Sequence, residues 1–411
     1  IAPAMEQSSH TDKWVPRTEL NAACTTIQPS RAGNRSVNNV AVAPGRISIA
    51  ITRIAPTDSK AATTVAAPAI AQGMPTVKWR LTSSFPKSLD TLYGGSEVFA
   101  KAINEMSDGK FEVKAFAAGE IVPGLQVADA VQNGTVEAGQ TAAYYYFGKH
   151  PNFVFETGLP FSMNQREYYA WLYFGGGHEL INEFYKEYNF RSFVFGGTGC
   201  QMGGWFRKEI KSMDDMKGLK FRVGGFAGLI LQRLGVVPQQ IAGGDIYPAL
   251  EKGTIDAAEW VGPYDDEKLG FYKIAPHYYY PGWWEACSMY GLYVNIKEWE
   301  KLPKEYQAAL EAACYEANLD MMAEYDFKNP QALQRLVKNG VRLHAYSTDI
   351  MRAAHKAAFE LYEEEAAKNP AWKKIYESWK KFREDEILWH RVAERSLSEF
   401  LNSNPGGAPG K

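Results

Sequence analysis

Two stretches of the chain carry the same short pattern, and this repeat limits the folds that the chain can adopt. The first reads DAVQNGTVEAGQTAAY over Asp129–Tyr144, and the second reads EKGTIDAAEWVGPYDD over Glu251–Asp266. In each copy an apolar helical segment stops at a glycine, Gly134 or Gly253, and a short apolar segment typical of a strand follows. Each copy is therefore predicted to be a helix that leads into a strand.

A polar residue follows each of the two predicted strands: Gln140 in the first copy, and Glu259 with Trp260 in the second. In open α/β sheets, ligands bind at the carboxyl ends of the strands. Two similar units in two halves of the chain therefore predict two α/β lobes that present strand ends to one shared cleft. Chance repetition of an ordinary helix-to-strand turn is the alternative interpretation.

The order of the other predicted elements agrees with an α/β fold. A strand, a helix and a second strand precede the first copy, which predicts a parallel sheet with right-handed crossovers. Further strands and a long helix follow in the second half. The predicted bounds are strands at Val77–Thr82, Phe111–Phe116, Phe190–Phe195, Gly204–Arg207, Lys220–Val223 and Met289–Asn295, and helices at Ser96–Met106 and from Lys304 to about Glu324.

The N-terminal residues 1–71 differ from the rest of the chain. They are rich in Ala, Thr, Ser and Pro, and they end in AAPAIAQG (Ala66–Gly73), which has the small-x-small form of a signal-peptidase site. We expect an unstructured leader, followed by an exported mature chain. A wrongly assigned start is the other interpretation, because this segment has no continuous apolar core.

Several function classes are disfavoured. The formal net charge of -2 gives no reason to expect a nucleic-acid partner. Motifs such as G-x-S-x-G, H-E-x-x-H and Walker A are missing, so an enzyme is the less favoured alternative. The glycine-rich run GGTGCQMGGWF fails the dinucleotide-binding pattern. No two cysteines have C-x-x-C spacing, although a Cys200–Cys287 disulfide stays open.

Four polar residues stand at predicted strand ends or in glycine-rich turns: Gln201, Arg222, Glu259 and Glu285. A buried arginine can bind a small carboxylate, and two or three hard oxygen ligands can bind a cation. Tyr145, in the aromatic run after the third strand, is a candidate cleft wall. Each residue alone would more often be a surface residue or part of a structural ion pair, but together they predict a binding site.

These residues lie in motifs that resemble a known family. The motifs are GCQMGGWF (Gly199–Phe206), GLKFRVGGFAG (Gly218–Gly228), IYPALEKGTIDAAEWVGPYDD (Ile246–Asp266), PGWWE (Pro281–Glu285) and W-x-x-L-P (Trp299–Pro303). The chain from Val77 to Phe400 resembles the extracytoplasmic substrate-binding subunit of a TRAP transporter, the DctP type. Within it, the chain most resembles the subgroup that binds 2-oxo acids together with a metal ion.

The resemblance implies a role for each candidate residue. Arg222 would bind the substrate carboxylate, and Gln201, Glu259 and Glu285 would ligate the cation. The carbonyl of Trp260 would complete the cation site while its ring covers the ligand. Tyr145 is a candidate substrate contact because of its place after the third predicted strand. The expected ligand is a 2-oxo monocarboxylate such as pyruvate or 2-oxobutyrate, with lactate or a C4-dicarboxylate as alternatives, to be delivered to the TRAP membrane permease.

The resemblance also implies a two-lobed periplasmic binding protein fold, type II-like, with the ligand cleft between the lobes, a long connecting helix and an extended C-terminal helix. The expected lobes are 75–199 plus 288–327 and 200–287 plus 328–370. Residues 371–411 would form a C-terminal helix that is exchanged in a homodimer. Large apolar side chains from Trp372 to Phe400 suit such a seam, although the same stripe could pack on its own lobe.

The nature of the metal stays open between Na⁺ and Ca²⁺. Arg222, two glutamates and a monocarboxylate together leave a charge of -2 before the metal binds. Calcium would neutralise the site and sodium would leave one negative charge, which a buried site tolerates less well. Charge therefore favours calcium, and resemblance to the subgroup slightly favours sodium.

Overall fold

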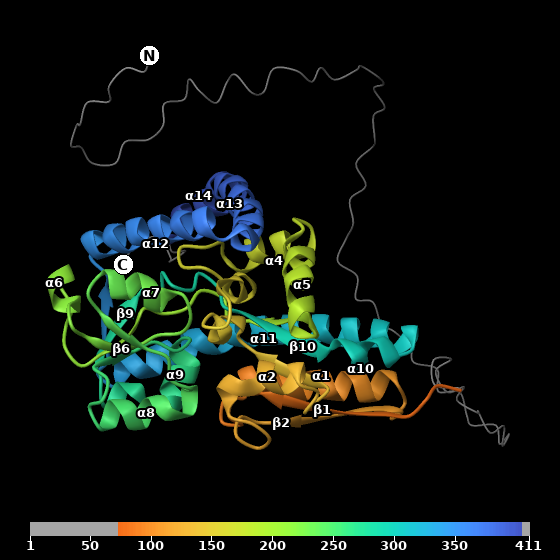
Figure 1. Ribbon diagram of the computed structural model, residues 1–411. Helices are drawn as coiled ribbons and strands as arrows, with labels where there is room; N and C mark the ends of the chain where they lie inside the picture. The colour runs from red at the N-terminus through yellow and green to blue at the C-terminus, as the bar shows by residue number, and fades with distance from the viewer. Residues whose placement is uncertain (1–72, 405–411) are drawn as a thin grey trace, which may run out of the picture. The chain divides into compact units, whose positions relative to one another are not determined.

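The computed structural model of the protein describes residues 73–404, so the predicted leader over residues 1–71 lies outside the described residues. Across residues 73–404 the strands form two mixed sheets, one of five strands and one of six (Figure 1). No helix in this range is both long and apolar enough to cross a membrane. We call the part built on the first sheet lobe I and the part built on the second sheet lobe II.

The sheet of lobe I has the strand order β2-β1-β3-β10-β4. Strand β1 runs parallel to both β2 and β3, whereas β10 runs antiparallel to β3 and β4. The predicted strands at Phe111–Phe116 and Met289–Asn295 have the observed bounds of β2 and β10. The bounds are β1 (Val77–Ser83), β2 (Phe111–Phe116), β3 (Ala138–Thr141), β4 (Phe190–Gly197) and β10 (Met289–Asn295).

The sheet of lobe II has the order β11-β9-β5-β8-β6-β7 and repeats the arrangement of the first. Strand β6 runs parallel to β7 and β8, and β5 runs antiparallel to β8 and β9. Strand β11 adds an edge strand parallel to β9. The bounds are β5 (Gly204–Phe206), β6 (Lys220–Arg222), β7 (Val237–Gln239), β8 (Ala257–Ala258), β9 (His277–Tyr280) and β11 (Arg342–Ala345).

The sequence repeat is a structural repeat. The helices α2 (Val127–Gln132) and α8 (Gly243–Glu251) end just before Gly134 and Gly253, and both glycines have φ of +71°. A left-handed φ of this kind favours glycine at the end of a helix. In each copy the amide after the glycine donates to a helix carbonyl, at 2.8 Å in the first copy and 3.0 Å in the second.

The acidic residue of each copy also has the same role. Glu137 accepts a hydrogen bond at 2.7 Å from the backbone amide of Arg80, in the parallel neighbour strand β1. Asp256 accepts one at 3.0 Å from the amide of Lys220, in the parallel neighbour strand β6. The strands β3 and β8 therefore lie at equivalent places in the two sheets, which confirms the prediction of two related α/β lobes.

Two segments of the chain cross between the lobes, residues 198–203 and 281–288. They pair with one another through backbone hydrogen bonds, Gln201 N to Glu285 O at 3.1 Å and Gly282 N to Gln201 O at 3.0 Å. Among the described residues, Cys200 and Cys287 lie in these segments as free thiols, so the disulfide that the sequence left open is not formed.

The long helix α11 (Lys304–Lys338) runs past both sheets (Figure 1) and contacts α1 and β4 in lobe I and α9 beside lobe II. The predicted end at about Glu324 is wrong. The helix continues through Pro330 because Ala332 and Leu336 beyond it are buried, and it ends before Gly340, which has φ of +88°. The last turns therefore gain enough buried contact to offset the break that a proline introduces.

The remaining helices cover the faces of the two sheets and the C-terminal side of the chain. Their bounds are α1 (Leu92–Met106), α3 (Val154–Thr157), α4 (Gln165–Tyr173), α5 (Gly177–Tyr185), α6 (Met213–Met216), α7 (Ala227–Arg233), α9 (Pro263–Leu269), α10 (Ile296–Lys301), α12 (Thr348–Lys368), α13 (Pro370–His390) and α14 (Ser396–Ser403). A π-helical turn, Arg391–Arg395, joins α13 to α14.

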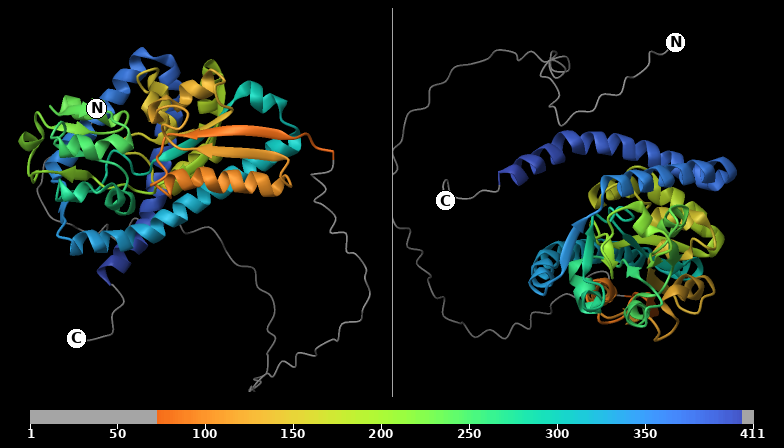
Figure 2. Two further views of the ribbon diagram at one scale, coloured as in Figure 1. Left: turned by 90° about the horizontal axis from the view of Figure 1, so that it is seen from below. Right: turned by 90° about the vertical axis from the view of Figure 1, so that its left-hand side faces the viewer.

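The C-terminal apolar stripe divides into two parts. Trp372, Ile375, Tyr376 and Trp379 are buried, because the start of α13 packs on α4, α5 and α12 of the same chain. From Leu388 onward the apolar side chains are exposed, and α13 and α14 extend away from the two sheets (Figure 2). The stripe is thus partly core, and its exposed residues are Leu388, Trp389, Val392, Leu397, Phe400 and Leu401.

Candidate functional site

Arg222 and Glu259 form a buried ion pair at the strand ends of lobe II. Arg222 is the last residue of β6, and Glu259 follows β8 directly. The Arg222 Nη1 donates to Glu259 Oε1 at 2.5 Å and to the Glu259 carbonyl at 2.7 Å, and Nε donates to the carbonyl of Ile241 at 3.1 Å. The amide of Gly224 also donates to Glu259 Oε1, at 2.7 Å. Both side chains are at most 1% exposed, so this pair is held in place by several bonds.

Gln201 and Glu285 face each other across the two crossing segments. Besides the 3.1 Å backbone bond between them, the Gln201 amide nitrogen donates to Thr198 Oγ1 at 3.3 Å. Both side chains are buried. The structure therefore brings these two predicted residues together at the junction of the lobes, next to the strand ends that carry Arg222 and Glu259.

Buried polar atoms of these four residues make no hydrogen bond to any residue in the range 73–404: Gln201 Oε1, Arg222 Nη2, Glu259 Oε2 and Glu285 Oε2. A buried polar atom without a partner costs about 1–3 kcal/mol, and more if it is charged. The free guanidinium nitrogen can donate a hydrogen bond to a small carboxylate, and the three free oxygens can bind a cation. A cation and a small carboxylate together would therefore satisfy all four atoms.

The electrostatics agree with a cation site. Burial raises the pKa of the Glu285 carboxyl well above its ordinary value, and the negative charge of Glu259 raises it further. Burial also raises the pKa of Glu259, against the opposing effects of Arg222 and the Gly224 amide. Two buried carboxyls whose pKa values are both raised, one of them by the charge of the other, are suited to share a metal cation.

The residues present fit a hard cation of the sodium or calcium kind. Within residues 73–404, no group of three or more His, Cys, Asp or Glu side chains gathers at one point. The set here has only two carboxylates, with an amide oxygen from Gln201 as the third free oxygen. Oxygen ligands without histidine or thiolate suit Na⁺ or Ca²⁺ and do not suit zinc or copper.

Aromatic rings form the walls of the site. The Trp260 ring lies under the Arg222 guanidinium, 4.9 Å from Cζ to the ring centroid, and contacts Phe85 of lobe I edge to face at 6.3 Å. Tyr144 and Tyr145, in the 3-10 turn Ala143–Tyr146 after β3, pack edge to face at 5.1 Å. Burial raises the pKa of Tyr145, and the positive charge of Arg222 opposes this rise.

Gln140, the counterpart of Glu259 in the sequence repeat, has a structural role. Its Oε1 accepts hydrogen bonds from Ser83 at 2.8 Å and Ser96 at 2.7 Å, and its Nε2 donates to the Leu92 carbonyl at 2.6 Å. The side chain is therefore fully bonded inside lobe I. Only the copy in lobe II contributes a charged residue to the site.

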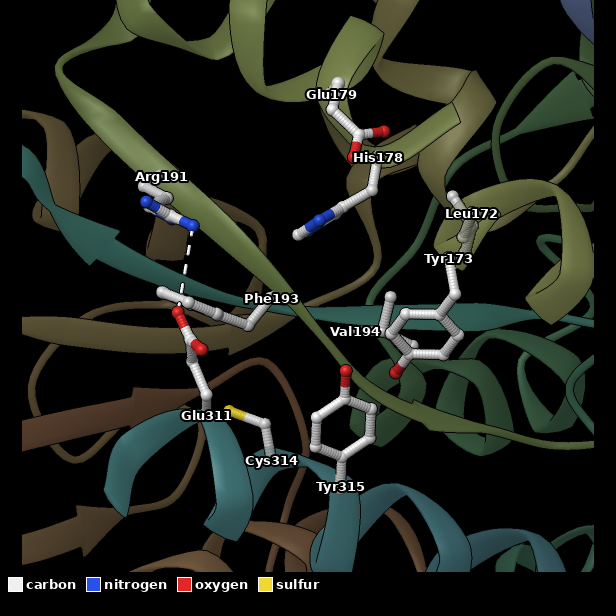
Figure 3. A pocket seen from close by; sticks show the side chains of 10 residues that line it. All are labelled: Leu172, Tyr173, His178, Glu179, Arg191, Phe193, Val194, Glu311, Cys314 and Tyr315. Atoms are coloured by element: carbon white, nitrogen blue, oxygen red, sulfur yellow. Dashed lines mark ion pairs between the residues drawn. The ribbon is translucent and has the colours of Figure 1, made fainter. Parts of the chain in front are cut away.

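A separate hollow of about 220 Å³ lies between α4, α5, β4 and α11. Its walls include Tyr173, Tyr315 and an ion pair between Arg191 and Glu311, 3.9 Å apart (Figure 3). None of the predicted site residues lines this hollow. The hollow is thus a distinct surface feature of lobe I.

Sequence reasoning missed several residues at the junction of the lobes. Phe85 and Tyr290 pack edge to face at 5.2 Å beside Trp260, and Gln240 joins the two lobes. The aromatic run after β3 contains Tyr145, which the sequence indicated as a candidate cleft wall. In the sequence, Gln239 and Gln240 resemble ordinary surface residues, and no motif or spacing distinguishes Gln240 from Gln239.

Two α/β lobes joined by crossing segments, with a buried charged site at their junction, define the class of solute-binding proteins that serve transport systems. The chain belongs to family 7 of the bacterial extracellular solute-binding proteins, DctP, whose family model matches residues 82–369. The predicted family and the predicted two-lobed fold are both confirmed.

Three known proteins show the similarity in detail. The chain is 53% identical, over 81% of its length and 91% of the relative's, to the monocarboxylate 2-oxoacid-binding periplasmic protein of Nostoc sp. (strain PCC 7120). It is 52% identical to a TRAP transporter solute-binding protein of Bordetella bronchiseptica RB50, a mixed-occupancy dimer with copurified calcium and picolinate at one active site; the TM-score is 0.79, over 80% of this chain and 98% of that one.

The third is a TRAP periplasmic solute-binding protein from Pseudoalteromonas atlantica T6c with bound sodium and pyruvate. It is 39% identical with a TM-score of 0.77, and the match covers 79% of this chain and 99% of that one.

Proposed function

We propose that this protein is the solute receptor of a TRAP transporter that binds a small 2-oxo monocarboxylate together with a metal cation. The observation that carries the proposal is the set of four buried polar atoms, on Gln201, Arg222, Glu259 and Glu285, that make no hydrogen bond within the described chain. The name of the Nostoc relative and the pyruvate in the Pseudoalteromonas structure support this ligand class. The calcium in the Bordetella structure and the sodium in the Pseudoalteromonas structure support a cation of one of these two kinds.

In this proposal each group has one task. Gln201, Glu259 and Glu285 bind the cation through their free oxygens, with the backbone carbonyl of Trp260 as a further ligand. Arg222 donates through Nη2 to the carboxylate of the acid, since its other two nitrogens are already bonded. Tyr145 and the ring of Trp260 enclose the rest of the acid.

The 2-oxo group accounts for selectivity. One carboxylate oxygen and the adjacent keto oxygen form a chelating pair that can complete the oxygen shell of the cation. A simple fatty acid has no second oxygen at that position, and a C4-dicarboxylate would need a second cationic group. The proposed ligand is therefore a 2-oxo monocarboxylate of the pyruvate or 2-oxobutyrate kind, in preference to lactate or succinate.

The wider arrangement is part of the same proposal. Lobe I comprises 75–199 plus 288–327, lobe II comprises 200–287 plus 328–370, and residues 371–411 form the dimerisation helix and tail. The protein works in the periplasm without turnover of its ligand and delivers the acid to the membrane permease. Two copies associate through the exposed apolar side chains at the end of α13 and in α14.

A thermal-shift screen tests this function. Pyruvate, 2-oxobutyrate, lactate and succinate are added to the protein in calcium, in sodium and in chelator with neither ion. We expect the 2-oxo acids to raise the unfolding temperature most, and only when a cation is present. Stabilisation by succinate alone, or release of a reaction product from pyruvate, would contradict the proposal.

A further inference from the structure

We infer that Gln240 is a positioning residue. Its side chain links lobe I to lobe II beside the ligand site, and this link lowers the dissociation rate of the ligand. The inference rests on the proposed function, because a fastening between lobes has this effect only if a ligand is enclosed between them. Gln240 follows β7 in lobe II and belongs to none of the cation or carboxylate ligands proposed above.

One side chain joins the backbones of both lobes. The Gln240 Nε2 donates to the carbonyl of Tyr145 at 2.9 Å, in the turn after β3 of lobe I. Its Oε1 accepts from the amide of Gly225 at 3.2 Å, in the turn after β6 of lobe II. The amide group of one glutamine therefore bridges two turns that both border the site.

The next residue links this bridge to the charged site. The carbonyl of Ile241 accepts the hydrogen bond from Arg222 Nε at 3.1 Å. Ile241 thus binds the side chain of Arg222, and the adjacent Gln240 binds the backbone of lobe I. Movement of lobe I away from lobe II would break the bond from Gln240 to Tyr145 while it leaves the bond from Arg222 to Ile241 intact.

A close approach of backbone and ring supports the same contact. A Cβ added at Gly224 would lie 2.7 Å from the Tyr144 ring, and one added at Gly225 would lie 2.6 Å from the Tyr144 Cβ. Such distances are too short for any real Cβ, so only glycines allow Tyr144 to pack this closely on lobe II. The glycines of the GGFAG motif therefore permit the lobes to meet at this point.

The effect on kinetics follows from where the bond lies. A bond between the lobes forms after the ligand has entered and must break before the ligand leaves. Its loss should raise the dissociation rate and leave the association rate almost unchanged. One net hydrogen bond corresponds to a change of about three- to tenfold.

The test compares Gln240→Ala with Gln239→Ala. Gln239 is the neighbouring glutamine at the end of β7, and within residues 73–404 its side chain makes no hydrogen bond, so it is a matched control. Stopped-flow tryptophan fluorescence, with calcium and pyruvate, gives both rates. We expect Gln240→Ala to raise the dissociation rate about three- to tenfold and Gln239→Ala to leave it within about twofold of the wild type.

A second variant tests the close approach. Gly224 has no left-handed φ, so Gly224→Ala keeps an unstrained backbone and the amide that binds Glu259. We expect it to retain the unfolding temperature without ligand and to lose at least tenfold in pyruvate affinity.

The inference is overturned if Gln240→Ala leaves the dissociation rate unchanged, if both glutamine variants raise it equally, or if the change lies in the association rate. Unchanged pyruvate affinity in Gly224→Ala would also overturn it. A wild-type protein that binds none of the 2-oxo acids in the presence of a cation would overturn the proposed function, and this inference with it. Normal wild-type binding with an unaffected Gln240 variant would overturn the inference alone.

Discussion

At the residue scale, Arg222 has two tasks that a lysine could not combine. It holds Glu259 and the Ile241 carbonyl through Nη1 and Nε, and within residues 73–404 its Nη2 makes no hydrogen bond, so the proposed function assigns Nη2 to the acid. A single ammonium group cannot reproduce three donors fixed in one plane. We expect Arg222→Lys to weaken acid binding by at least tenfold, as measured by calorimetry in saturating calcium.

Circular dichroism should show that the Arg222→Lys variant is folded. Unchanged affinity would mean that the guanidinium does not touch the acid.

Glu156 is a buried carboxyl of lobe I, and its environment predicts a pH dependence of stability. It accepts hydrogen bonds from Tyr185, at 2.7 Å, and from Ser192, and burial raises its pKa from 4.5 to about 7. The folded protein therefore keeps a proton that the unfolded chain releases. The resulting stabilisation is complete below pH 4.5 and is lost as the pH rises to about 7.

Glu156→Gln mimics the protonated form and cannot titrate. We expect the unfolding temperature of the wild type, relative to that of Glu156→Gln, to fall between pH 4.5 and 7. Thermal unfolding at four pH values in this range measures the difference. Parallel profiles for the two proteins would show that folding does not raise the pKa of Glu156.

At the element scale, the end of α13 and the helix α14 carry apolar side chains that do not pack on the rest of the described chain. Leu388, Trp389, Val392 and Phe400 are 58–65% exposed, whereas Trp372 and Trp379 anchor the start of α13. We expect deletion of residues 391–411 to leave the fold intact and to convert a dimer into a monomer. Light scattering on both proteins gives the mass, and thermal unfolding checks the fold.

A deletion that begins at residue 371 is the informative contrast, because it removes Trp372 and Trp379 from the core as well. It should lower the unfolding temperature strongly. A monomeric full-length protein would show that the exposed side chains serve some other contact.

Elements could be predicted where local pattern and packing agree. The apolar runs of β2 and β10 give their observed bounds, and the helix-glycine-strand repeat identified both lobes. The end of α11 could not be predicted, because the burial of Leu336 depends on a distant part of the chain. Sequence spacing also does not show which nitrogens of Arg222 are already hydrogen-bonded. It does not show that Gln240, and not Gln239, bridges the lobes, because both facts depend on three-dimensional contacts.

At the scale of the whole molecule, cation and acid should bind as a unit. Glu259 and Glu285 would repel an incoming carboxylate, and two like charges ~4 Å apart at an effective dielectric constant of about 20 cost about 4 kcal/mol. We expect pyruvate to bind the calcium-loaded protein and not the chelated, sodium-free protein. Small-angle scattering should show a smaller radius of gyration only when both ligands are present.

Two comparisons sharpen this measurement. Glu285→Gln should lower the affinity for calcium at least tenfold, whereas Glu156→Gln should not, because the buried carboxyl of Glu156 is bonded to Tyr185 and Ser192 and is not one of the proposed cation ligands. Butyrate should bind much more weakly than 2-oxobutyrate. Equal affinity for these two acids would show that the keto oxygen does not contact a cation.

The charged groups of the site come from lobe II and the crossing segments, whereas Phe85, Tyr144 and Tyr145 of lobe I provide rings. This division has a consequence for evolution. In the proposed site, mutations in lobe I would change the space around the tail of the acid without disturbing the groups proposed to bind its carboxylate and keto oxygens. A lineage of such receptors can therefore drift toward longer or shorter acids in small steps, each of which leaves a working receptor, while the chemistry of the head group is inherited unchanged.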